Sequence, residues 1–224
     1  MGVMFCLQEG NVLLEKDFST HREFLKWLRS GVVPEDLRVG YIRNQVWIET
    51  MPERAFAHNQ IKTKIAAVLM PLVDKDGFGT YFGDGMTYTN EDSGFTTVPD
   101  GIIVTSDSIQ QGRVRLKGGR RSHHDTELVG TPDLVIEVVS ESSEAKDCDW
   151  LMTWYWNAGI QEYWLVDARE EPLVFQIHRA GPKGFVPQRR QEGWLKSPVL
   201  GKSFRFVRSA LNAFRKIDYT LEIR

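Results

Sequence analysis

The stretch LVIEVV at 134–139 constrains the fold of this chain more than any other feature. Successive side chains of a strand point to opposite faces, so a nearly continuous β-branched run predicts a strand buried on both faces of a sheet. Capping residues follow at 140–143, a helix is expected over 144–157 and ends at Gly159, and an apolar strand is expected at 160–167. Strand, helix and strand in this order predict a right-handed parallel crossover, and therefore an α/β protein.

Other segments predict further elements around this crossover. Helices are expected where apolar residues recur every three or four positions, and strands where β-branched and aromatic residues cluster between turn residues. The region at 112–131 lacks apolar periodicity, so we expect a loop or an irregular insertion there. The expected elements are a helix at 18–30, a hairpin at 37–50, a helix at 53–73, strands at 80–88 and 101–105, and a helix at 209–214.

Size and composition favour one domain in a reducing compartment. The 224 residues, 42% of them apolar, suffice to bury one full core. Cys6 and Cys148 are too few for a disulfide framework or a Cys-type zinc site. The sequence shows neither a signal-peptide pattern nor an apolar stretch of about 18 residues, so we expect a cytoplasmic protein without a membrane span. Because the net charge is −2 at pH 7, any attraction to nucleic acid must be local.

Two acids stand at unusual places in this pattern. Glu137 interrupts the buried run, and burying an ionised carboxylate is costly unless it is paired, hydrogen-bonded or bound to a metal. A basic partner on a neighbouring strand would explain Glu137, and Asp100, which follows Pro99, could simply cap a turn. Together, however, two acids on adjacent strands suit a hard cation such as Mg²⁺, which prefers oxygen ligands. A metal ion held there would activate water and stabilise the charge that develops on a phosphate during hydrolysis.

Several segments carry a resemblance to a known family. They are VPDG at 98–101, TPDLVIEVVS at 131–140, Asp147, Tyr155, AGI at 158–160 and EYWLVD at 162–167. On these residues the chain resembles the Uma-two family, a large bacterial group assigned as endonucleases, over about 39–206. The resemblance implies a PD-(D/E)XK, restriction-endonuclease-like fold with a mixed central sheet flanked by helices. It also implies one such domain over 1–224, with an N-terminal helical extension at about 1–36.

The same resemblance implies a DNA endonuclease that uses Mg²⁺ or Mn²⁺ to hydrolyse phosphodiester bonds. Asp100 matches the aspartate of the PD motif, and Glu137 matches the acid of the following motif. Val138 would add a metal ligand through its backbone carbonyl, and Glu49 matches an acid that would lie near the metal. His58 matches a histidine that would position water or contact the scissile phosphate, although a lone histidine is otherwise a surface or capping residue.

The lysine of the motif is missing. It would stand two residues after the second acid, where the chain has Val139, or four residues before Tyr155, where the chain has Leu151. This lysine orients the attacking water and offsets negative charge in the transition state, so its loss could cost orders of magnitude in rate. Lys146 is the nearest basic residue and a candidate replacement, with a solvated lysine as the alternative. The pattern therefore supports metal binding better than cleavage.

Basic residues without an intervening acid gather in the region expected to be a loop. Such a cluster would contact DNA phosphates, or else it is a solvated surface loop. The adjacent His123 and His124 do not predict a zinc site, because neighbouring residues rarely chelate one ion well and no third ligand is suitably spaced. The residues expected to bind nucleic acid are Arg113, Arg115, Lys117, Arg120 and Arg121.

Two alternatives to an active nuclease remain open at this point. The first is a non-catalytic nucleic-acid-binding or regulatory protein that keeps the fold and has lost the chemistry. The second is a dimeric protein-interaction module, because Trp150 and Trp154 share one face of the helix expected over 144–157. Core packing explains these tryptophans equally well, and a homodimer is also consistent with a restriction-like nuclease in which each subunit cuts one strand.

Overall fold

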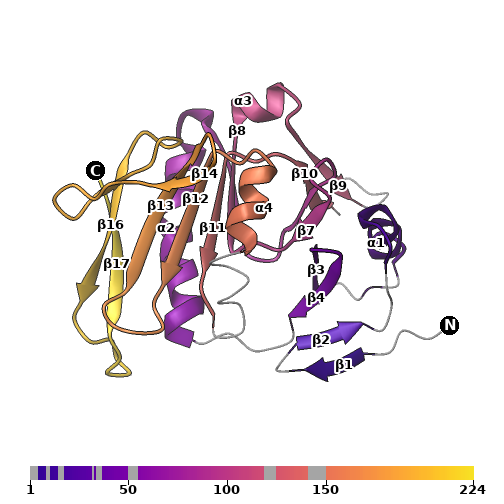
Figure 1. Ribbon diagram of the computed structural model, residues 1–224. Coiled ribbons are helices and arrows are strands. Elements are labelled where there is room, and N and C mark those ends of the chain that lie inside the picture. The colour runs from indigo at the N-terminus through magenta and orange to yellow at the C-terminus, as the bar shows by residue number, and fades with distance from the viewer. Residues whose placement is uncertain are drawn as a thin grey trace. The chain divides into compact units, whose positions relative to one another are not determined.

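A computed structural model describes residues 5–8, 11–14, 18–31, 33, 37–49, 55–118, 125–140 and 150–224. The chain passes back and forth between two compact units (Figure 1). Unit 1 comprises Met1–Pro52, Gly85–Pro99 and Arg115–Gly130. Unit 2 comprises Glu53–Asp84, Asp100–Val114 and Thr131–Arg224.

Unit 2 contains a mixed sheet of six strands. The buried run predicted at 134–139 forms one of its inner strands, and its partner strand from 162 to 167 runs parallel to it, as the crossover predicted. The other neighbouring pairs in this sheet are antiparallel. In order across the sheet the strands are β14 (Gly184–Pro187), β13 (Val174–Gly181), β12 (Glu162–Asp167), β11 (Leu134–Val138), β8 (Gly101–Thr105) and β5 (Gly79–Gly83).

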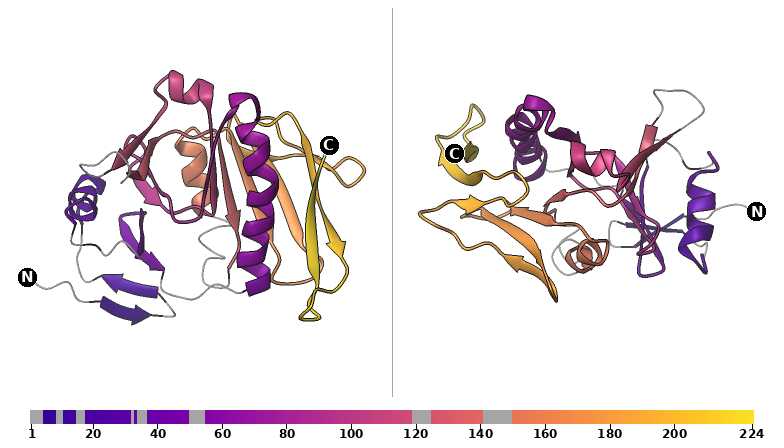
Figure 2. Two further views of the ribbon diagram at one scale, coloured as in Figure 1. Left: turned by 180° about the vertical axis from the view of Figure 1, so that it is seen from behind. Right: turned by 90° about the horizontal axis from the view of Figure 1, so that it is seen from above.

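Helices cover both faces of this sheet, as expected for an α/β protein. The π-helical turn η1 (Ala55–Asn59) leads into α2 (Gln60–Asp74), so the long helix predicted at 53–73 is confirmed. Figures 1 and 2 show α2 on one face and α4 (Met152–Asn157) on the other. Ile61, Ile65 and Leu69 of α2 share one apolar core with residues of the strands, namely Ile103, Leu134, Ile136, Val138 and Trp164.

A third sheet ends the chain, with β15 (Leu195–Lys196), β16 (Ser203–Ser209) and β17 (Asp218–Ile223) antiparallel. The helix predicted at 209–214 is wrong, because this segment connects β16 to β17. The side chain of Asn212 accepts the N–H groups of Phe214 at 2.9 Å and Lys216 at 3.1 Å. These local bonds compete with helical ones, and Arg215 with φ of 57° leaves the helical region altogether.

Unit 1 contains a sheet of eight strands and the helix α1 (His21–Leu28). Thr20 caps α1 by accepting the N–H of Glu23 at 3.2 Å, and Phe24 packs in the core, so the helix predicted at 18–30 is confirmed. The extension expected at about 1–36 also holds two strands that the sequence did not predict. In order the strands are β1 (Phe5–Gln8), β2 (Asn11–Leu14), β4 (Gln45–Glu49), β3 (Arg38–Ile42), β7 (Phe95–Thr97), β6 (Thr87–Asn90), β10 (Asp125–Gly130) and β9 (Val114–Gly118).

The hairpin predicted at 37–50 is confirmed as β3 and β4. Its turn residues Arg43 and Asn44 have φ of 55° and 61°, the conformation that matches a two-residue hairpin turn to the twist of its strands. The single strand predicted at 80–88 is wrong, because β5 and β6 are separated by a turn in which Gly85 has φ of 96°.

The loop predicted at 112–131 is also wrong in its described parts, which form β9 and β10. β9 lies at the edge of its sheet and is exposed along most of its length, so its sequence lacks the alternation that identifies a half-buried strand. A short helix α3 (Ser106–Gln110) and a 3₁₀ turn at Lys75–Gly77 complete the elements. None of the helices described is long and apolar enough to cross a membrane.

Candidate metal centre

The structure brings Asp100 and Glu137 to neighbouring positions of two paired strands. β8 and β11 are antiparallel with Gly101 opposite Ile136, and one further step of this register places Asp100 opposite Glu137. Asp100 Oδ2 accepts the backbone N–H of Val138 at 2.7 Å. The predicted pair is therefore adjacent in space, although the two residues are 37 positions apart in the sequence.

Gly101 allows the close approach of strands beside Asp100. A Cβ atom at this position would lie 2.9 Å from Tyr81 Oη and 3.3 Å from Ile136 Cδ1. Distances of this kind leave no room for a side chain in a packed interior. Burial first, and then the negative charges of Asp100 and Asp84, raise the pKa of the Tyr81 hydroxyl.

Asp100 is buried, and two basic side chains of unit 2 face its carboxylate. His58 Nε2 lies 3.5 Å from Oδ2, and Lys62 Nζ lies 3.3 Å from Oδ1. Burial opposes ionisation of Asp100, but the hydrogen bond and charge of His58, the charge of Lys62 and the N–H of Val138 together lower its pKa. The group is therefore held as a carboxylate, the form that binds a cation.

Lys62 is a residue that sequence reasoning missed. It lies on α2 one turn after His58, so both side chains fall on the same face of the helical segment. Its ammonium is buried and lies 2.7 Å from Oδ2 of Asp84, in the turn after β5. The spacing of four residues from His58 was the available signal, but it did not distinguish Lys62 from an exposed lysine.

Glu137 is also buried, and it contacts a helix on the other face of the sheet. The hydroxyl of Tyr155, on α4, donates to Glu137 Oε1 at 2.5 Å. Val139 and Leu151, the two positions at which the motif would carry its lysine, are 1% and 0% exposed. Both positions therefore belong to the apolar interior, where an unpaired ammonium would be costly.

Two other buried acids of unit 2 have structural partners. Asp133 accepts the N–H of Thr105 at 2.7 Å and the hydroxyl of Ser108 at 2.8 Å, which ties the start of β11 to the end of β8. Glu162 accepts the indole N–H of Trp164 at 2.6 Å and the N–H of Val199 at 2.9 Å. These contacts account for both acids within the fold.

The remaining predicted site residues lie elsewhere or outside the described residues. Glu49 is the last residue of β4 in unit 1, where it stands opposite Arg38 in the register, and its side chain is outside the described residues. Lys146 is outside them as well, and so are Arg120, Arg121, His123 and His124. The roles expected of Glu49 and Lys146 stay predictions.

The described members of the basic cluster differ in their surroundings. In unit 2, Arg113 Nη1 lies 3.3 Å from Asp133 Oδ1, so this guanidinium takes part in the contacts that hold β11. On β9, Arg115 is exposed and lies 3.8 Å from Glu91, and Lys117 is exposed. Arg115 and Lys117 are accessible to a phosphate backbone, and the predicted role of the cluster in DNA binding stays a prediction.

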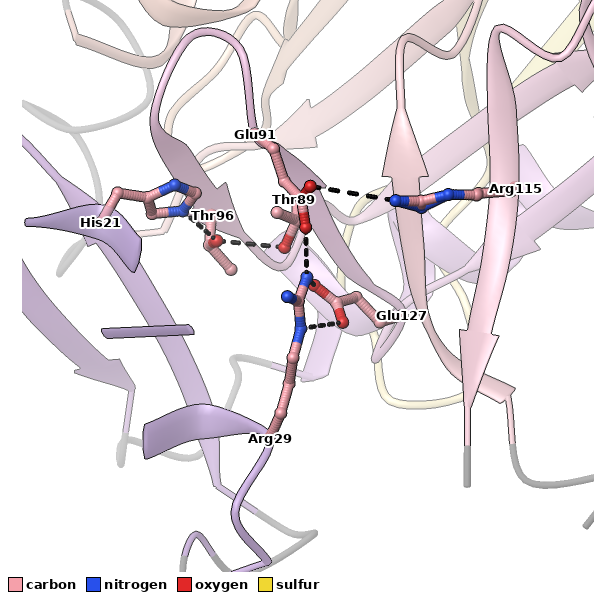
Figure 3. Close-up of polar contacts among 7 residues, drawn as sticks. All are labelled: His21, Arg29, Thr89, Glu91, Thr96, Arg115 and Glu127. Carbon is pink, nitrogen blue, oxygen red and sulfur yellow. Dashed lines mark hydrogen bonds and ion pairs between the residues drawn. The ribbon is translucent and has the colours of Figure 1, made fainter. Parts of the chain in front are cut away.

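Unit 1 holds a separate polar network, drawn in Figure 3. Arg29 donates to both carboxylate oxygens of buried Glu127, at 2.9 and 2.8 Å, and to Glu91 at 2.9 Å. His21 Nε2 lies 2.9 Å from Thr96 Oγ1. Burial first and then the charge of Arg29 lower the pKa of His21 to about 4, so the ring is neutral at neutral pH. The network fastens the end of α1 to β10, and its two carboxylates, Glu91 and Glu127, are both paired with Arg29.

Asp100 and Glu137 offer carboxylate oxygens, the kind of ligand that a magnesium-type ion prefers. Among the described residues, no group of three or more His, Cys, Asp and Glu side chains is arranged to hold a metal. A cation at this site would therefore depend on the carboxylates of Asp100 and Glu137 and the carbonyl oxygen of Val138. Mg²⁺ is commonly held in this way, by one or two carboxylates while it keeps several water ligands.

A family model and a solved structure are similar to this chain. A family model described as "Uma2: Putative restriction endonuclease" matches residues 21–205. A solved structure described as a "putative nuclease belonging to DUF820", from Anabaena variabilis ATCC 29413, is similar with a TM-score of 0.60. Its sequence identity is 19%, and the match covers 81% of this chain and 90% of that chain, which shows that the two share a fold. A search of the curated proteins found no match.

Proposed function

This chain belongs to the Uma2 family of "putative restriction endonucleases", and from that premise we propose that it is a divalent-metal-dependent DNA endonuclease. The observation that carries the proposal is the environment of Asp100. This buried carboxyl group has a lowered pKa and is bonded to the N–H that follows Glu137. An ionised acid beside a second buried acid is stabilised by a cation.

In this proposal Asp100, Glu137 and the carbonyl of Val138 hold Mg²⁺ or Mn²⁺. The ion would act as a Lewis acid and supply an activated water when bound. His58, whose Nε2 lies 3.5 Å from Oδ2 of Asp100, orients water or a phosphate oxygen by hydrogen bonding. Tyr155 fixes the rotamer of Glu137 through its hydroxyl.

Further parts of the proposal concern the substrate and the assembly. The exposed side chains of Arg115 and Lys117, together with Arg113, Arg120 and Arg121, contact DNA phosphates. Glu49 supplies an additional acid near the metal. One nuclease-like domain spans the chain, since the family match runs through segments of both units. A homodimer and a cytoplasmic location also remain part of the proposal.

A non-catalytic nucleic-acid-binding protein is the second candidate. The observation that favours it is that buried apolar residues, Val139 and Leu151, occupy both positions at which the family is expected to carry its lysine. Such a protein would keep the carboxylates and the basic surface but would not cleave. Binding and cleavage must therefore be measured separately.

Supercoiled plasmid incubated with Mg²⁺ or Mn²⁺ tests the proposal. We expect the wild type to produce nicked and linear DNA, and Asp100→Asn and Glu137→Gln to lose this activity. Asp107→Asn, an exposed acid on α3, is the matched control and should cleave normally. Equal cleavage by wild type and Asp100→Asn would show that the site is wrong. Plasmid binding without cleavage by the wild type would favour the second candidate.

A further inference from the structure

Lys62 is a buried lysine of unit 2 that faces two acids. Its side chain is 8% exposed, with Nζ 2.7 Å from Asp84 Oδ2 and 3.3 Å from Asp100 Oδ1. Removing an ammonium group from water is costly, so a buried lysine requires charged or hydrogen-bonding partners. Both partners are carboxylates, and one of them is the proposed metal ligand.

Lys62 makes more contacts than a single ion pair requires. Asp84 alone, at 2.7 Å, already offers Lys62 a close partner of opposite charge. Asp100 likewise has the N–H of Val138 and the imidazole of His58. The additional contact between Lys62 and Asp100 places the ammonium at the carboxylate around which the proposed reaction would take place.

A second lysine on the same helix shows what a structural pair looks like here. Lys64 Nζ lies 2.8 Å from Asp218 Oδ1 and links α2 to β17. Its side chain is 24% exposed, whereas that of Lys62 is 8% exposed. The two pairs have similar distances but different surroundings, so they form a matched comparison.

We propose that Lys62 performs, from α2, the function of the lysine that the chain lacks at Val139 and Leu151. The inference rests on the proposed nuclease function. The ammonium donates hydrogen bonds to the attacking water and to a non-bridging phosphate oxygen, and it offsets the negative charge that grows there. Asp84 is a positioning residue that holds Nζ toward Asp100.

The chemistry balances without a proton from Lys62. The water oxygen forms a bond to phosphorus as the bond from phosphorus to the leaving deoxyribose oxygen breaks with its electron pair. The proton of the attacking water passes to bulk water, and the leaving oxygen takes a proton from bulk water. Lys62 remains an ammonium ion throughout, so its role is electrostatic and geometric.

Plasmid cleavage and Mn²⁺ binding, measured on the same full-length variants, test the proposal. We expect Lys62→Met to cleave about 100- to 1,000-fold more slowly than the wild type, the range for loss of one donor at a developing charge. Its Kd for Mn²⁺, measured by electron paramagnetic resonance, should be unchanged or lower, since a positive charge beside Asp100 is gone. Lys62→Arg should recover part of the rate, and Lys64→Met should cleave like the wild type.

The possible outcomes separate the two proposals. If the wild type cleaves and Lys62→Met cleaves equally fast, the role of Lys62 is wrong while the nuclease function stands. If Lys62→Met loses Mn²⁺ binding together with cleavage, Lys62 only maintains the site, and the proposal is overturned. If neither wild type nor Lys64→Met cleaves, both proposals fail. Should Lys62→Met not fold, Asp84→Asn keeps the ammonium but releases it, and an unchanged cleavage rate in that variant would contradict the proposal.

Discussion

Asp100 and Val138 are joined across two antiparallel strands, with the carboxylate accepting the backbone N–H at 2.7 Å. This bond connects the acid before β8 to the residue that directly follows Glu137. It forms because Gly101 lets β8 and β11 approach closely beside Tyr81. A substitution at Gly101 therefore tests whether this close packing is needed.

Replacing Gly101 by alanine should destabilise the protein by about 1–3 kcal/mol, the usual cost of overpacking a tight interior. The added Cβ would lie 2.9 Å from Tyr81 Oη. Urea denaturation followed by circular dichroism measures the change. Tyr81→Phe combined with Gly101→Ala should cost less than the two single changes together, because the opposing oxygen is gone.

Gly83→Ala is the control for that experiment. Gly83 stands opposite Gly101 in the register of β5 and β8, but its Cβ would meet only a ring carbon of Tyr81 at 3.8 Å. We expect this variant to be clearly more stable than Gly101→Ala. Equal losses in both would mean that glycine is needed for the strand itself and not for the close approach.

His21 should make stability depend on pH between about 4 and 6.5. Its pKa is lowered from 6.5 to about 4 in the folded protein, chiefly by burial. Between these values the unfolded chain binds more protons than the folded one, so stability falls as the pH falls. Denaturation at pH 7.5 and pH 5 should show a smaller loss for His21→Gln than for the wild type. Identical losses would exclude His21 as the source.

Arg29 should contribute strongly to the stability of unit 1. Arg29→Met leaves the buried carboxylate of Glu127 without its two guanidinium bonds, for which we expect a loss of about 2–4 kcal/mol. Arg29→Met combined with Glu127→Met should restore part of it, since no buried charge then remains. Arg115→Met, on an exposed side chain 3.8 Å from Glu91, should change stability by less than about 0.5 kcal/mol.

The basic cluster should separate into two kinds of residue in DNA binding. Arg115→Gln and Lys117→Gln should each lower the slope of log affinity against log salt by about 0.9, the value for one phosphate contact. Fluorescence anisotropy with a labelled duplex measures this slope. Arg113→Gln should instead reduce stability, because Arg113 contacts buried Asp133. A full salt slope in all three variants would contradict the assignment of this surface.

The sequence alone determined those features that are set by neighbouring residues. The apolar run at 134–139 and the helix and strand after it predicted the parallel pair β11 and β12, because burial on both faces leaves a pattern within a few residues. Arg43 and Asn44 likewise predicted their own turn. The helix predicted at 209–214 does not form, because the side chain of Asn212 accepts backbone N–H groups in place of helical hydrogen bonds.

Only the tertiary structure decided which distant side chains meet. Lys62 and Asp84 are 22 residues apart, and Arg29 and Glu127 are 98 apart, so neither pair leaves a periodic signal. The acids Asp100 and Glu137 were predictable as a pair, but their surroundings were not. The turn after β5 and the register of β8 against β11 bring Asp84 and Asp100 to Lys62, the buried lysine of α2. Long-range contacts of this kind depend on tertiary packing and not on the local sequence.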